Sequence, residues 1–110
     1  MQINESNERG IIILEINGEV NIDTIAELKK IFDKLLKGKP AAVLLNLKGL
    51  DYIDSSGLAC LIDFSKGLKN IHGELLLCAM PAKIRSIFAM TKLDKAFRVH
   101  DTQEEALESA

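Results

Sequence analysis

The sequence LKGLDYIDSSGLACLI, residues 47–62, joins an apolar strand to an apolar helix through a loop that ends in Asp-Ser-Ser-Gly. Serine is a preferred N-cap, because its side-chain oxygen can accept from a free backbone N–H group of the first helical turn. Those N–H groups and the helix dipole also favour an anion at this position. A serine hydroxyl here can therefore carry a phosphate at low electrostatic cost.

Strand and helix patterns alternate on both sides of this stretch. A turn signal at residues 7–10 separates the first two strands, and the segment between the strand at 41–47 and the next helix is expected to be a loop. The expected elements, in chain order, are strands over 2–5 and 10–18, a helix from about 24 to 37, a strand over 41–47, a helix over about 56–70, a strand over 74–79, a helix that begins at Pro81, an edge strand over 97–99 and a short helix from 102.

This order predicts an α/β fold over residues 1–110 as one domain, with right-handed crossovers and four to five helices flanking the sheet. The sheet is expected to be mixed and mostly parallel, with one antiparallel strand from the N-terminal hairpin. Loops that leave the carboxyl ends of parallel strands meet at one rim, where ligands usually bind. Residues 21–24 and 51–56 both leave such ends, so we expect them to be neighbours.

Two helices carry informative patterns. In the first, Thr24 and Glu27 form a capping-box pattern, with Asn21 or Asp23 as competing N-caps. In the second, apolar residues spread over roughly 200° of the helical wheel, which is wider than one sheet contact requires. We expect the extra arc to meet a neighbouring helix. The third helix has Ile84, Ile87, Phe88 and Met90 as its apolar positions.

Composition excludes several classes of function. The chain has 110 residues, of which 47% are hydrophobic, and a formal charge of −2, which is too near neutral to suggest a nucleic-acid surface. No apolar run approaches the length of a membrane span, and no signal-peptide pattern is visible, so a cytoplasmic location without membrane insertion is expected.

The residues that usually bind metals or act as nucleophiles are sparse. Cys60 and Cys78 lie in apolar stretches and are expected to be reduced, buried thiols. His72 and His100 lack ligand spacing, so neither a metal nor another cofactor is expected. The serine pair has no Gly-x-Ser-x-Gly elbow, and no phosphate-cradling glycine loop occurs. The chain is therefore expected to act by binding rather than as an enzyme.

The residues also resemble a known family, the STAS domains, and within it the bacterial anti-sigma factor antagonists. The Asp-Ser-Ser-Gly-Leu motif, in this context, is the most specific part of the resemblance. The matching segments span almost the whole chain: Gly18-Glu19-Val20, the strand Val43–Leu47, the motif Tyr52–Leu58 and the tail Met90–Phe97.

The resemblance implies a phosphorylation switch. An unphosphorylated antagonist of this family binds an anti-sigma factor that is also a serine kinase, and so releases a sigma factor. The kinase phosphorylates the second serine of the motif, here Ser56, and a serine phosphatase reverses the reaction. One departure is Asn21, where the family often has aspartate. An alternative is a STAS subunit of a transport or stress-signalling complex in which the serine is never modified.

The residues expected to contact the partner are Asn21, Asp23, Thr24, Asp54, Ser55, Ser56 and Gly57. Each also has a purely structural explanation. Ser55 is the expected N-cap, and Asp54 either bonds nearby backbone N–H groups or orients the serine. Gly57 either lets a partner approach the backbone or eases the start of the helix.

Overall fold

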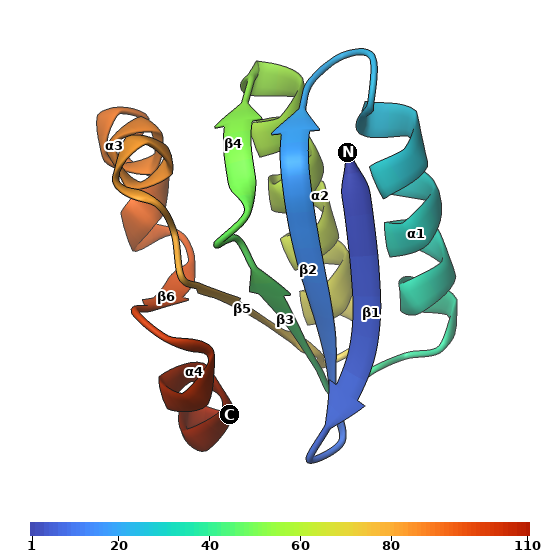
Figure 1. The fold of residues 1–110 in the computed structure, drawn as a ribbon. Coiled ribbons are helices and arrows are strands. Elements are labelled where there is room, and N and C mark those ends of the chain that lie inside the picture. The colour runs from blue at the N-terminus through green and yellow to red at the C-terminus, as the bar shows by residue number, and fades with distance from the viewer.

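A computed structural model describes residues 1–110 as a six-stranded mixed sheet flanked by four α-helices and one short 3₁₀-helix (Figure 1). The elements are β1 (Gln2–Glu8), β2 (Ile11–Val20), α1 (Ile25–Lys37), β3 (Ala42–Asn46), β4 (Leu50–Ile53), α2 (Ser55–Asn70), β5 (Glu74–Cys78), α3 (Ala82–Met90), η1 (Leu93–Lys95), β6 (Arg98–His100) and α4 (Gln103–Ser109). The predicted α/β class and mixed sheet are confirmed.

The sheet has the strand order β1-β2-β3-β5-β6, in which only the β1–β2 pair is antiparallel. The first strand is longer than predicted and ends at Glu8, since Arg9 and Gly10 both have positive φ angles and make a two-residue hairpin turn. Such turns match the twist of the strands that they join. The antiparallel hairpin strand expected from the sequence is therefore present.

Strand β4 was not predicted. The prediction that the whole segment between β3 and α2 is a loop is therefore wrong. Strand β2 has ten residues and β3 only five, so β2 pairs with β3 along its first half and with β4 along its second. The partner of β2 changes from β3 to β4 near Gly18, whose N–H donates to the Gly49 carbonyl. Figure 1 shows β4 beside the end of β2, beyond the end of β3.

Helices α1, α2 and α3 contribute to one core cluster of 22 buried residues, whereas α4 covers a smaller cluster of eight on Ala42, Leu44 and Leu76. Helix α2 contacts α1 through stacked rings of Phe32 and Phe64, whose centroids are 3.9 Å apart. The prediction that the wide apolar arc of α2 meets a neighbouring helix is thus confirmed.

Helix α3 begins at Ala82, with Pro81 as its N-cap rather than its first residue. Ile84 and Phe88 are buried as predicted, but Met90 is 81% exposed and belongs to no core cluster. Met90 follows Phe88 by two residues, about 200° around the helix, and therefore faces away from the buried side. None of the helices combines the length and apolar character needed to cross a bilayer.

Candidate partner-binding site at the start of helix α2

Asp54 links the end of β4 to the start of α2. Its N–H donates to the Val20 carbonyl (3.1 Å), and its side-chain Oδ1 accepts from the Gly57 N–H (3.0 Å). Asp54 has extended backbone angles and is the N-cap of α2, so the prediction that Ser55 caps the helix is wrong. The reason is that β4 continues to Ile53, which leaves the extended residue that a cap requires at position 54.

Ser56 lies in the first turn of α2 and is half-buried, whereas Ser55 is exposed. The Ser56 hydroxyl donates to Asp54 Oδ1 at 2.6 Å. This short bond to a charged acceptor holds Oγ in one orientation at the helix N-terminus. Both explanations weighed for Asp54 therefore apply at once, because the carboxylate bonds backbone N–H groups and orients the serine.

The two loops expected to be neighbours do meet. The N–H of Ile22 donates to Asp54 Oδ2 at 3.1 Å, across 32 positions of sequence. The two oxygens of one carboxylate thus bind Ser56 on one side and the loop between β2 and α1 on the other. This contact confirms the prediction that residues 21–24 and 51–56 share a rim of the sheet.

The loop between β2 and α1 is fixed by its own side chains. Asn21 Oδ1 accepts from the N–H groups of Asp23 (2.9 Å) and Thr24 (3.2 Å). Thr24 Oγ1 accepts from the Asn21 N–H (2.9 Å) and donates to the Glu19 carbonyl (3.0 Å). Asn21 therefore fixes the loop that precedes the helix. Thr24 is the N-cap of α1 but makes no side-chain cap bond, and the predicted capping box of Thr24 with Glu27 does not form, because the Thr24 hydroxyl is already engaged.

Asn21 needs no negative charge for this role. Each of its two bonds uses one amide oxygen as an acceptor of backbone N–H groups, which an aspartate oxygen would accept in the same way. The departure from the family's aspartate therefore leaves the geometry of the loop intact. The rim has one negative charge fewer than it would have with aspartate at position 21. The exposed Asp23, in the same loop, still contributes a negative charge.

Gly57 is buried, and its contact with a partner stays a prediction. A Cβ atom at this position would lie 2.6 Å from Ile53 Cγ1 and 2.8 Å from Val20 Cγ1. The glycine is therefore required by packing within the domain, where α2 starts against β2 and β4. The sequence does not predict this requirement, because it depends on strand β4, which the sequence pattern does not predict.

The charge of Asp54 is stabilised by its surroundings. The hydrogen bond from the Ser56 hydroxyl, followed by the bonds from the N–H groups of Gly57 and Ile22, lowers the pKa of this carboxyl below its usual value of 3.8. The side chain is therefore an anion at neutral pH. An anion with a lowered pKa is a weak base, so Asp54 can orient the hydroxyl but is poorly suited to remove its proton.

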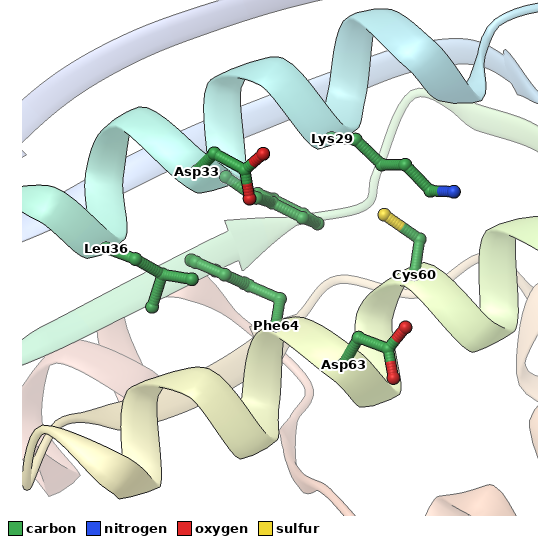
Figure 2. Close-up of a pocket in the computed structure, with 7 residues that line it drawn as sticks. Lys29, Asp33, Leu36, Cys60, Asp63 and Phe64 are labelled. Carbon is green, nitrogen blue, oxygen red and sulfur yellow. The ribbon is translucent and has the colours of Figure 1, made fainter.

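A groove of about 170 Å³ lies between α1 and α2 (Figure 2). Phe32, Leu36, Cys60 and Phe64 contribute its apolar part, and Lys29, Asp33 and Asp63 its polar edge. Burial raises the pKa of the Cys60 thiol to about 11, so the groove contains no thiolate nucleophile at neutral pH. None of the seven predicted site residues lines it.

Comparison with known proteins agrees with this architecture. A family model described as the STAS domain matches residues 2–106. The chain belongs to the STAS domain family.

Within this family, the chain is similar to several anti-sigma factor antagonists. The chain is 26% identical to an anti-sigma F factor antagonist of Paenibacillus polymyxa, and the match covers 97% of this chain and 92% of that relative. An anti-sigma factor antagonist from Mycobacterium paratuberculosis has a similar fold, with a TM-score of 0.90, 22% identity and coverage of 98% and 92% of the two chains. The Bacillus cell fate determinant SpoIIAA in its phosphorylated form also has this fold, with a TM-score of 0.75, 18% identity and 98% coverage of each chain.

Proposed function

We propose that this protein is an anti-sigma factor antagonist whose binding is switched off by phosphorylation of Ser56. The observation that carries the proposal is the Ser56 hydroxyl, which stands at the N-terminus of α2 and is oriented by Asp54 at 2.6 Å. Membership of the STAS family, a relative named as an anti-sigma F factor antagonist and a fold neighbour described in a phosphorylated form support it.

In this proposal the unphosphorylated protein binds an anti-sigma factor with serine kinase activity, and a sigma factor is released. The kinase transfers a phosphoryl group from ATP to Ser56 Oγ, and a serine phosphatase later removes it. Asp54 is a positioning residue in this reaction, since its lowered pKa suits it to orient the hydroxyl. The base that accepts the hydroxyl proton is expected to come from the kinase.

The physical basis of the switch is charge. A phosphoserine carries about −1.5 to −2 charges at pH 7 and has no hydroxyl proton to donate, so Asp54 Oδ1 loses one of its two donors, keeps the Gly57 N–H and gains a neighbouring anion. The N-terminus of α2 stabilises the phosphate by about 0.3–1 kcal/mol, and we expect the domain to stay folded when Ser56 is phosphorylated.

The cost arises in the complex. A kinase must place nucleotide phosphates opposite Ser56, so the new dianion meets anions on both sides of the interface. An uncompensated charge at an interface costs about 2–5 kcal/mol, or about 30- to several-thousand-fold in affinity. A change of that size reverses the choice of partner without a large conformational change.

The test uses the serine-kinase anti-sigma factors of the source genome, each purified and incubated with the protein and ATP, followed by phosphosite mapping. We expect label on Ser56. Ser55→Ala is the matched control, since this neighbouring serine is exposed and makes no bond to Asp54; the variant should be labelled like the wild type. Ser56→Ala should lose the label.

Binding gives a second readout. By calorimetry, Ser56→Asp should weaken binding to the kinase that labels the protein, whereas Ser56→Ala should retain it. Equal affinities for these two variants would remove the electrostatic mechanism. Absence of label on Ser56 with every kinase would instead favour a STAS subunit that is never modified.

A further inference from the structure

Ile22 is a large apolar side chain that the fold leaves in solvent. It is 71% exposed, and only Tyr52 and Met90 are comparable, at 46% and 81%. Scattered exposed apolar residues are ordinary on protein surfaces. Ile22 differs from Met90 in its surroundings, since Met90 ends a helix, whereas Ile22 sits in the loop that contacts Asp54.

The backbone around Ile22 is held rigidly. Its own N–H donates to Asp54 Oδ2, and the residues on either side are fixed by the bonds of Asn21 Oδ1 and Thr24 Oγ1. An exposed side chain on a preorganised loop can be buried by a partner without the entropic cost of ordering the loop. These features are those of an anchor residue in an interface.

Ile22 is also tied to the proposed phosphoacceptor. Asp54 Oδ2 binds the N–H of residue 22, and Oδ1 of the same carboxylate binds the Ser56 hydroxyl. A partner that reaches Ser56 Oγ therefore meets the Ile22 loop at the same time.

The charge of this rim is far from that of the whole chain. At the rim itself, residues 18–28 contain three acidic side chains and residues 49–58 contain two, and neither segment contains a lysine or an arginine. The formal charge of the full chain is only −2, so the basic residues lie elsewhere. A surface of one sign favours and steers a partner of the opposite sign.

We propose that Ile22 is the apolar anchor of the partner-binding surface, and that the partner presents an apolar socket rimmed by basic residues beside its phosphoryl-transfer site. The proposal rests on the function proposed above and names the residue that selects the partner. The basic rim meets the loop carboxylates, whereas the nucleotide phosphates face Ser56. Docking and the phosphorylation switch are thereby separate parts of one surface.

The experiment uses the kinase that labels Ser56 of the wild-type protein. Ile22→Ala should weaken its binding to that kinase by about 10- to 30-fold, the loss typical of an anchor residue. In phosphorylation assays this variant should raise the KM for the protein and leave kcat unchanged, since Ser56 and Asp54 are intact. Ile22→Leu should restore binding to within a few-fold, because it keeps the apolar volume.

Met90→Ala is the matched control, since Met90 is at least as exposed and lies outside the loop. It should bind like the wild type, and circular dichroism should show that all three variants are folded. Two results would overturn the proposal: affinity of Ile22→Ala within twofold of the wild type, or equal losses for Ile22→Ala and Met90→Ala. Either could occur while Ser56→Asp still weakens binding, in which case the proposed switch stands and only the anchor is wrong.

Discussion

The carboxylate of Asp54 makes three bonds that have different purposes. It caps α2 through the Gly57 N–H, orients the Ser56 hydroxyl and holds the loop between β2 and α1 through the Ile22 N–H. A charged acceptor makes all three bonds stronger than a neutral one would. Local order at this rim should therefore depend on the ionisation of a single side chain.

The first prediction concerns pH. The pKa of Asp54 is lower in the folded protein than in the unfolded chain, so its contribution to stability is fully present above the usual value of 3.8. That contribution is lost as the pH falls through the lower, folded value. Asp54→Asn should therefore unfold at a lower temperature than the wild type at pH 7, and the difference should shrink below pH 4.

Thermal unfolding of both proteins between pH 2 and 7 would measure this difference, and a carboxyl-carbon NMR titration would report the folded pKa directly. Asp23→Asn is the control, since Asp23 is exposed and is not an acceptor of these bonds. A constant gap between wild type and Asp54→Asn over the whole range would show that the carboxylate charge is not the stabilising factor.

At the scale of elements, the long helices and inner strands could be predicted from periodicity, but β4 could not. Leu50-Asp51-Tyr52-Ile53 is only four residues long, and its two central residues are exposed. It is a strand because ten-residue β2 extends past five-residue β3 and leaves its last residues without a partner. This mismatch is visible only in the structure, because the strands predicted over 10–18 and 41–47 are nearly equal in length.

The missed strand also explains the misplaced cap. Both Asp54 and Ser55 are favoured N-cap residues, and sequence preference alone does not separate them. The end of β4 at Ile53 makes the choice. The contact between residues 21–24 and 51–56 could be predicted without β4, because it follows from the order of the parallel strands.

The second prediction tests the junction of α2 with β2 and β4. Gly57→Ala would place a methyl group 2.6 Å from Ile53 Cγ1 and 2.8 Å from Val20 Cγ1, and both neighbours are buried. Overpacking costs about 1–3 kcal/mol and outweighs the roughly 0.5–1 kcal/mol that alanine gains in helix propensity. We expect urea unfolding to show a net loss of about 1–2 kcal/mol.

Gly38→Ala provides the matched control. Gly38 follows α1 with φ −77°, and its nearest added contact would be the Leu35 carbonyl at 3.4 Å, an ordinary van der Waals distance. It should be neutral or slightly stabilising, by less than about 1 kcal/mol. Stability of Gly57→Ala equal to that of the wild type would mean that α2 can shift away from the sheet, against the packing described.

At the scale of the whole molecule, the two faces of the sheet are protected unequally. Three helices contribute to the larger cluster, whereas seven-residue α4 alone contributes to the smaller one, through Ala106 and Leu107. The amino end of α4 is capped by Thr102, whose hydroxyl oxygen accepts from the Glu105 N–H. Its hold on the sheet therefore rests mainly on two side chains.

The third prediction separates stability from recognition. Leu107→Ala removes a nearly fully buried side chain and should lower the free energy of unfolding by about 2–4 kcal/mol. Glu108→Ala, an exposed neighbour in the same helix, should change it by less than about 0.5 kcal/mol. Urea unfolding measures both. At temperatures where both variants are folded, their rates of Ser56 phosphorylation should match that of the wild type. A slower rate for Leu107→Ala would mean that α4 influences the rim.

Strand β2 divides its length between two ladders, and this division has an evolutionary consequence. The ladder with β3 is surrounded by core residues and tolerates little change, whereas the ladder with β4 ends in the residues that a partner would touch. Paralogues in one cell can therefore diverge in partner choice by altering the last few positions of two adjacent strands and the turns that follow them. Under the proposed function, duplicated copies would each bind a different kinase while they keep the same interior.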